Sequence, residues 1–182
     1  MQKGFTLIEI LISISVSILL FFVLAQVHDI SHRTYRSADS KAEIIQNGRV
    51  ILDRLVREIR QSPEIITEIS QDTSEASNEI IFQDGHEISN INYIRYYVDQ
   101  NQLFREEFYF YFSDDASSTH VYFYAKDDTG NDPIISSSTP KIIGEYIDEI
   151  EFWGNKLINI NLYLSKGKFI QTINTSAYGR NL

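Results

Sequence analysis

An apolar stretch near the N-terminus constrains this chain more than any other feature of its sequence. Sixteen of the twenty-one residues from Phe5 to Ala25 are hydrophobic, and Glu9 is the one charged residue among them. At about 1.5 Å per residue, a helix of this length measures about 31 Å, close to the thickness of the hydrocarbon core of a bilayer. We therefore expect residues 5–25 to form a membrane-spanning helix.

A secretory signal peptide and the core helix of a soluble protein are the alternatives to a membrane span. A signal peptide would end at a small-x-small cleavage site, which Val23 to Ala25 would supply, but its apolar run is ordinarily about 7 to 15 residues long. The core helix of a soluble protein is usually apolar along one stripe and not on every face. Length and flanks both favour the membrane span.

The first ten residues, MQKGFTLIEI, combine several features in a fixed order. A short leader carries the basic residue Lys3 and ends at Gly4, Phe5 follows, and a Thr-Leu-Ile-Glu run ends at Glu9 where the apolar segment continues. This order resembles the prepilin signature of the type IV pilin family. The resemblance implies that a membrane-embedded prepilin peptidase cuts between Gly4 and Phe5 and that the new N-terminus, Phe5, becomes N-methylated.

The same resemblance assigns a role to Glu9. In the family, the carboxylate at this position pairs with the N-terminal amine of a neighbouring subunit. Opposite charges attract strongly in a medium of low dielectric, but each charge is costly there without its partner, so we expect the pair to specify the axial register between subunits. The implied partners are other pilin or pseudopilin subunits, the prepilin peptidase and an inner-membrane assembly platform.

The charges that flank the apolar stretch bear on its orientation in the membrane. Lys3 favours a cytoplasmic N-terminus, whereas Arg33 and Arg36 beyond the other end oppose it. The family resemblance decides for a single-pass protein of the cytoplasmic (inner) membrane whose C-terminal domain lies outside the cytoplasm and later joins a pilus or pseudopilus.

Beyond the apolar stretch the sequence becomes amphipathic without a break. Apolar residues recur at spacings of three, four and seven from Ala38 to Ile59, which predicts a helix with one apolar stripe, and Pro63 should end it. We expect one helix from Phe5 to Gln61, with Gly48 as the weak interior point where it could bend. Residues 52–61 are similar to the end of this helix in minor pilin-like proteins of the pseudopilin J and W type.

The remainder of the chain is strand-like after a polar linker or surface loop at residues 64–79. A hairpin turn is expected at Ser165 to Lys168, before the last strand. β-branched and aromatic content predicts seven strands. They are Glu79–Gln83, Ile91–Asp99, Leu103–Phe112, Val121–Lys126, Glu149–Trp153, Leu157–Leu164 and Phe169–Ala177.

These patterns together predict an α+β, pilin-like fold in which the helix stripe packs on an antiparallel sheet. We expect a leader at residues 1–4, a transmembrane or filament-core half of the helix at 5–25, an amphipathic half at 26–62, and a β-rich extracytoplasmic domain at 63–182. Phenylalanines at strand spacing from Phe104 to Phe112 should pack one face against the helix. A stacking platform for sugars or bases is the alternative use of these rings.

Composition narrows the possible chemistry. The chain has no Cys, which excludes disulfide bonds, thiolate metal sites and a thiol nucleophile. Its net charge of −9 is uneven, because residues 1–62 carry eight Lys or Arg and six Asp or Glu, while residues 63–182 carry eight and nineteen. An acidic domain lacks the clustered cations that bind phosphate groups, so we expect no nucleic-acid partner.

No residue pattern predicts catalysis, a cofactor or a metal site. Residues 127–132 (DDTGND) form an oxygen-rich loop, but their spacing departs from the EF-hand pattern, so a solvated turn is the favoured interpretation and Ca²⁺ binding stays open. His28 and His32 are one helical turn apart, as zinc ligands can be, without an evident third ligand.

The sequence therefore favours a structural, non-enzymatic subunit over an enzyme. We expect a minor pilin or pseudopilin of a type IV pilus, a type II secretion pseudopilus or a competence pseudopilus, acting in assembly initiation near the tip. The alternative is a membrane-anchored extracytoplasmic adhesin or binding module. A third possibility is a secreted β-rich enzyme released after Ala25.

Overall fold

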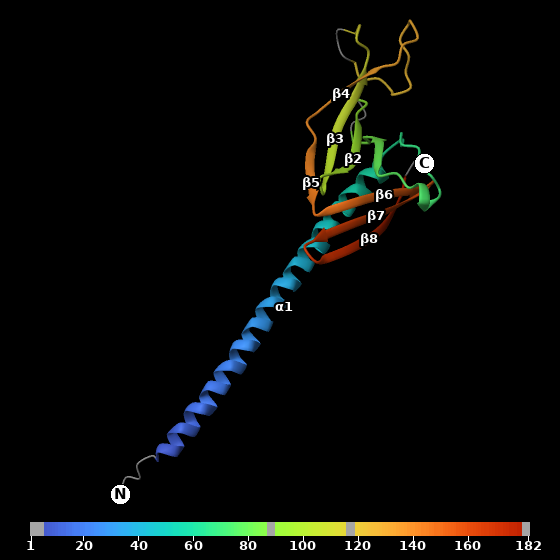
Figure 1. The fold of residues 1–182 in the computed structure, drawn as a ribbon. Coiled ribbons are helices and arrows are strands. Elements are labelled where there is room, and N and C mark those ends of the chain that lie inside the picture. Colours follow the sequence, from blue (N-terminus) through green and yellow to red (C-terminus); the bar gives the residue numbers. More distant parts are fainter. Residues whose placement is uncertain (1–5, 87–89, 116–118, 180–182) are drawn as a thin grey trace. The chain divides into compact units, whose positions relative to one another are not determined.

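The computed structural model describes residues 6–86, 90–115 and 119–179 of a chain that divides into two compact units, residues 1–42 and 43–182. A single α-helix, α1 (Leu7–Gln61), belongs to both units, and unit 2 also holds a short 3₁₀ helix, η1 (Thr73–Glu75). The strands, labelled in Figure 1, are β1 (Glu79–Gln83), β2 (Tyr93–Asp99), β3 (Gln102–Tyr111), β4 (Ile134–Ser137), β5 (Lys141–Glu145), β6 (Ile147–Gly154), β7 (Leu157–Lys166) and β8 (Phe169–Tyr178). The fold is α+β, with a long N-terminal helix and antiparallel sheets, as predicted.

The ends of α1 follow from local chemistry. The helix begins at Leu7, two residues after the predicted start at Phe5, which lies outside the described residues. It ends at Gln61 as predicted, since Pro63 follows and the hydroxyl of Ser62 donates to the carbonyl of Glu64 at 2.8 Å.

Gly48 has a packing role in place of the predicted bend. The helix is continuous through Gly48, which is buried. A Cβ atom built on this glycine would lie 2.5 Å from Cδ1 of Ile173 in β8 and 3.3 Å from Cδ1 of Leu164 in β7. The missing side chain therefore lets the helix backbone approach these two strands closely.

The strands form two antiparallel sheets and not the single sheet that the sequence predicted. Sheet A has the order β1-β2-β3-β4, and β5 also pairs with β3. The first half of β3 pairs with β5 and its second half with β4, so both short strands lie along one edge of β3. Sheet B has the order β6-β7-β8, and Gly167, with φ of +64°, forms the predicted hairpin turn before β8.

Strand boundaries agree with the prediction to within two residues for six of the seven segments, and one predicted strand is wrong. Residues 121–126 form a single bridge, between Val121 and Phe110, followed by turns. The sequence prediction missed β4 and β5, which are four and five residues long. Strands this short give too few alternating positions for a period of two to be recognised.

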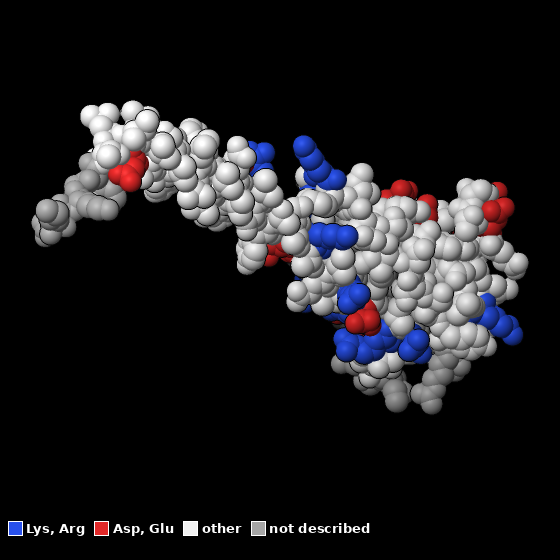
Figure 2. All heavy atoms as spheres, turned by 90° about the horizontal axis from the view of Figure 1, so that it is seen from below, with Lys and Arg blue, Asp and Glu red and all other residues white. Residues whose placement is uncertain are grey.

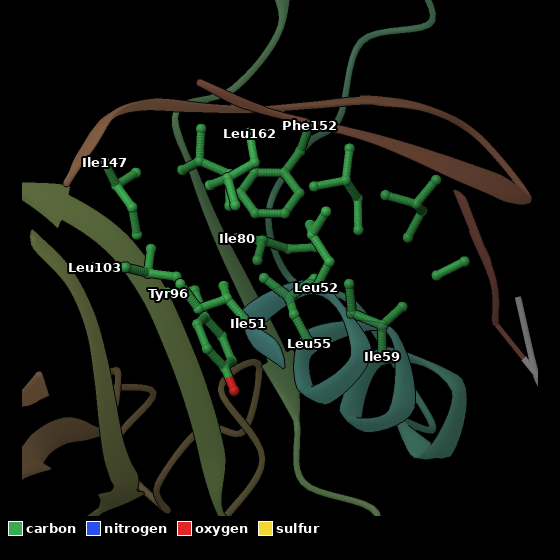
Figure 3. Packing of buried hydrophobic residues seen from close by; sticks show 14 of the residues in the cluster. Ile51, Leu52, Leu55, Ile59, Ile80, Tyr96, Leu103, Ile147, Phe152 and Leu162 are labelled. Atoms are coloured by element: carbon green, nitrogen blue, oxygen red, sulfur yellow. The ribbon is translucent and has the colours of Figure 1, made fainter. Parts of the chain in front are cut away.

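The hydrophobic core of unit 2 lies between α1 and both sheets. Figure 3 shows Ile51, Leu52 and Leu55 on the helix with Tyr96 and Leu103 of sheet A on one side, and Phe152 and Leu162 of sheet B on the other. The predicted stripe is confirmed from Leu52 onward, while Ala38 and Ala42, in unit 1, are exposed. The buried apolar side chains of the helix are those of Ile44, Ile51, Leu52, Leu55 and Ile59.

A buried charged network joins α1 to sheet A. Glu58 and Arg105 are each only 7% exposed. One carboxylate oxygen of Glu58 accepts hydrogen bonds from the hydroxyl of Tyr96 at 2.7 Å and from Nε of Arg105 at 3.0 Å, and the other accepts from Nε of Arg54 at 3.0 Å. Burial alone would raise the pKa of Glu58, but these three donors outweigh it and hold the pKa below its ordinary value of 4.5.

This network explains why the expected packing of the phenylalanine run is wrong. Leu103 and Arg105 are the β3 residues that turn toward α1, so the phenylalanine between them, Phe104, faces away and stacks on Tyr97 with ring centroids 5.5 Å apart. Phe108 is buried against Tyr93 instead, at 5.8 Å. The aromatic rings therefore pack mainly on one another.

The polar segment 64–79 is more than a linker. Its backbone pairs with the outer edges of both sheets: the amide of Ile66 donates to the carbonyl of Ile81 in β1 at 2.9 Å, and Ser77 and Phe152 of β6 exchange two hydrogen bonds of 3.0 and 2.8 Å. The segment thus covers one edge of sheet A and one edge of sheet B, which a polar composition alone does not reveal.

We predict that Glu58→Gln lowers the free energy of unfolding of unit 2 by about 2 kcal/mol at neutral pH, because the buried Arg105 then loses its buried carboxylate partner and pairs only with the more exposed Glu107. The pKa of Glu58 is lower in the folded state, so the carboxylate stabilises the fold above pH 4.5 and loses this effect as the pH falls through its folded-state pKa. The difference in free energy of unfolding between the wild type and the variant should therefore become smaller at acid pH.

Thermal unfolding of the full chain in detergent, followed by near-ultraviolet circular dichroism at several pH values, measures this difference. Asp53→Asn is the control, since it removes an exposed carboxylate from the same helix and should change stability by no more than about 0.5 kcal/mol. A difference in stability that is absent at neutral pH, or that stays constant down to acid pH, would contradict the role given to Glu58.

Candidate functional site

The N-terminus of α1 is capped by reciprocal hydrogen bonds between Thr6 and Glu9. The backbone amide and the hydroxyl of Thr6 donate to Oε2 of Glu9 at 2.9 and 3.0 Å, and the amide of Glu9 approaches the Thr6 hydroxyl at 3.4 Å. This is a capping box, in which the residue before the helix and the third helical residue satisfy each other's free amides. It explains why the helix begins at Leu7.

This capping box was not among the predicted features, although its Thr-x-x-Glu spacing is a recognisable signature in the sequence. Both cap hydrogen bonds to the carboxylate use Oε2, and Oε1 of Glu9 has no hydrogen-bond partner among the described residues. The helix N-terminus thus holds one carboxylate oxygen and leaves the other free to accept from a cation or donor of another molecule.

The helix that follows is apolar on every side and exposed throughout. All residues from Thr6 to Arg36 are exposed, and within the described chain α1 is long and apolar enough to cross a membrane. Figure 2 shows this stretch as a surface almost free of charged side chains. An apolar face of this extent is not covered by anything else in unit 1, as expected for a helix whose surroundings are lipid or other helices.

Three serines interrupt the apolar stretch, and each is satisfied locally. The hydroxyls of Ser13, Ser15 and Ser17 donate to the backbone carbonyl four residues earlier, at 2.8, 2.9 and 2.8 Å. A hydroxyl bonded in this way does not enter hydrocarbon with an unpaired donor. The polar residues of the stretch are therefore compatible with a membrane-spanning segment.

The other predicted site residues at the N-terminus, Lys3, Gly4 and Phe5, lie outside the described residues. Their proposed roles in the leader, in cleavage and in N-methylation accordingly rest on the sequence.

In the oxygen-rich loop at residues 127–132, groups of the loop itself donate hydrogen bonds to the carboxylate of Asp127. Asp127 accepts hydrogen bonds from the amide and hydroxyl of Thr129 and from the amide and side chain of Asn131, at 2.7 to 2.8 Å. These donors, the Asn131 amide first, lower the pKa of Asp127 to about 2. The carboxylate is thus committed within the loop, as the solvated-turn interpretation expects.

No group of three or more His, Cys, Asp or Glu side chains is arranged to hold a metal ion within the part of the chain that the structure describes. His28 and His32 lie side by side, with ring centroids 4.4 Å apart and rings nearly perpendicular, as aromatic neighbours one helical turn apart.

We predict that Thr6→Val, which keeps the shape of the side chain but removes its hydroxyl, speeds hydrogen exchange of the amides in the first turn of α1. The cause is loss of a capping partner for those amides. Hydrogen-exchange mass spectrometry of the full chain in detergent measures the effect. Thr6→Ser retains the hydroxyl and should exchange as the wild type does; equal exchange in Thr6→Val and Thr6→Ser would contradict the capping role.

Comparison with known proteins identifies one part of the chain. Residues 1–25 match the family model described as the prokaryotic N-terminal methylation motif. The chain matches no curated protein and no solved structure. The matched residues contain the predicted leader, the capped Glu9 and the apolar part of α1, which together fit a membrane-anchored, structural subunit. The motif supports a type IV pilin-like chain, a family whose members are processed by prepilin peptidase and assemble with other pilin subunits.

Proposed function

We propose that this chain is a structural minor pilin or pseudopilin subunit of a type IV pilus, type II secretion pseudopilus or competence pseudopilus. The observation that carries the proposal is the methylation motif at residues 1–25, in which Glu9 is a capped carboxylate at the start of a helical stretch, residues 7–25, that holds no other charged residue. The fold agrees, since α1 supplies both an exposed apolar segment and the stripe on which the sheets of unit 2 pack.

Processing would create a cationic partner for Glu9, whose Oε1 has no hydrogen-bond partner among the described residues. Cleavage between Gly4 and Phe5 would remove Lys3 with the leader and leave a methylated ammonium at Phe5. A cation at the membrane boundary requires a counter-ion nearby, and the free Oε1 of Glu9 in an adjacent subunit can supply it. One pair of charges in an apolar setting then selects one axial offset between subunits, since other offsets leave both charges unpaired.

The position of the subunit within the filament follows from its second resemblance. Residues 52–61 are similar to the helix end of the pseudopilin J and W type, so we place the subunit near the tip, where it acts in initiation of assembly. Residues 5–25 would lie in the membrane and later in the filament core, and residues 63–182 outside the cytoplasm. The absence of Pro from the apolar half distinguishes this helix from that of many major pilins.

We predict that Gly4→Glu blocks processing and leaves a membrane-resident precursor, because the residue at the cleavage position would no longer be small. Intact-mass spectrometry of the protein from its native host measures this: the wild type should begin at a methylated Phe5, and the variant at Met1. Gln2→Glu is the control, since it makes the same change of charge two residues upstream and should be processed.

Processing of the Gly4→Glu variant at the wild-type position would contradict the cleavage assignment. A wild-type chain beginning at Gln26 would instead identify a secreted protein, and one beginning at an unmodified Met1 a plain membrane anchor.

Deletion of the gene separates the tip subunit from the alternative, an adhesin or binding module. We expect filaments or pseudopili to become rare or absent in the deletion strain, because a priming subunit lowers the barrier to assembly. Electron microscopy of surface filaments, with complementation by the wild-type gene as control, tests this. Filaments of normal number with lost attachment would support the adhesin instead.

A further inference from the structure

Strand β8 is an open edge of sheet B. Among the described residues it pairs only with β7, and no backbone hydrogen bond from outside the sheet reaches it. The other edges are covered or short: residues 64–67 pair with β1, residues 70–77 pair with β6, and β4 and β5 have four and five residues. At ten residues, β8 is the long edge that the fold leaves uncovered, as Figure 1 shows.

The sequence of β8 lacks the devices that usually protect such an edge. Its ten residues, FIQTINTSAY, include no charged residue and no proline, and its register with β7 runs without a bulge. Exposed edges ordinarily carry Lys, Pro or a bulge, because an unprotected row of amides and carbonyls invites another strand. An unprotected edge of this length leaves a row of backbone amides and carbonyls available to another strand.

The register shows which backbone groups of β8 face outward. Phe152 of β6 directs its amide and carbonyl away from β7, toward Ser77. In an antiparallel ladder the hydrogen-bonded and non-hydrogen-bonded pairs alternate, so Ile160, opposite Phe152, directs its groups toward Thr175 of β8. The neighbouring Asn174 then presents its amide and carbonyl to the open edge.

A groove of about 590 Å³ lies between this edge and the last turns of α1. Basic side chains gather in one area of the face of unit 2 drawn in Figure 2. Arg57 and Arg60 are exposed at the groove and have no ion-pair partner among the described residues, whereas Arg54 and Arg105 are both paired. The lining residues are Asp53, Val56, Arg57, Arg60, Gln61 and Thr175.

We propose that the edge of β8 binds an extended segment of another protein as a fourth strand of sheet B, and that this segment carries acidic residues at alternate positions. Side chains of a paired strand that point toward α1 would lie over the groove. Alternate residues of a strand are about 7 Å apart, and residues three apart on a helix are about 5 to 6 Å apart. Two carboxylates on one face of the segment can therefore reach Arg57 and Arg60.

Electrostatic repulsion disfavours a second copy of this chain as the strand that pairs with β8. A twofold pairing of two β8 strands would bring Arg57 and Arg60 of both copies to the same junction, because Thr175, which lines the groove, lies near the middle of β8. The most acidic strand of this chain, β6, has its outer edge occupied by Ser77 and Ser70. The proposal concerns unit 2 alone and does not depend on how the N-terminus is processed.

The test uses the full chain in nanodiscs of zwitterionic phospholipid and a fluorescein-labelled peptide in which Glu alternates with Val and Thr. Fluorescence anisotropy should show binding about tenfold or more tighter than for the same peptide with Gln in place of Glu. Asn174→Pro removes an outward amide without touching the ladder to β7, and should abolish binding, while Asn174→Thr keeps the amide and should bind as the wild type does.

The arginines are tested by charge exchange. The double variant Arg57→Glu with Arg60→Glu should lose the Glu peptide and bind a peptide with Lys in place of Glu, and Arg57→Lys with Arg60→Lys should retain the Glu peptide. Equal binding by Asn174→Pro and the wild type, or no preference for Glu over Gln, would overturn the proposal. So would self-association of the wild type that Asn174→Pro abolishes, without binding of the Glu peptide.

Discussion

Burial of one helix stripe between two sheets is the interaction on which the rest of unit 2 depends. A three-stranded sheet alone buries little, and the two sheets share α1 as the element that covers the inner face of each. Leu55 and Ile59 are completely buried by this arrangement. The buried carboxylate of Glu58 adds a directional constraint, since its two donors from sheet A, Tyr96 of β2 and Arg105 of β3, can be met only at one rotation of the helix against these strands.

The same helix faces two different surroundings along its length, and its composition changes accordingly. In residues 7–25 apolar residues occupy every side, and the hydroxyls of the three serines are bonded within the helix. From Ile44 onward one stripe is buried and the opposite side is polar, with Arg49, Arg57 and Arg60 exposed. Unit 2 as a whole is acidic, with twelve Lys or Arg against twenty-two Asp or Glu, so these three arginines, which have no ion-pair partner in the part of the chain that the structure describes, form a local exception.

Local patterns in the sequence predicted the parts of the fold that depend on local chemistry. The period of the apolar residues and Pro63 defined α1 almost to the residue, and β-branched and aromatic content located β7 at Leu157, its first residue. Contacts between distant segments were not predictable in this way. Glu58 and Arg105 are forty-seven residues apart, and nothing in the spacing of either indicates the other.

Turns and sheet edges were likewise difficult to predict from local patterns in the sequence. The hairpin from β2 to β3 turns through Gln100 and Asn101, which both have positive φ although neither is glycine, so the usual turn signal is weak. The polar segment before β1 has the composition of a loop, yet its backbone pairs with two strands, because pairing depends on amides and carbonyls that every residue type except proline carries in full. The open edge of β8 became recognisable only once the covered edges were known.

At the N-terminus, the structure adds to the motif a reason for its threonine. A carboxylate in an apolar helix is costly while it has no partner, and under the proposed function the chain carries it before any neighbouring subunit is present. Thr6 offers Glu9 two donors within the same chain, one from its backbone and one from its hydroxyl, and both converge on Oε2. This cap lowers the free-energy cost of the Glu9 carboxylate before assembly and leaves its Oε1 unused. Under the proposed function, assembly then adds the ammonium of a neighbouring subunit to a carboxylate already held in place, so the pairing can select register with little further ordering of the Glu9 side chain.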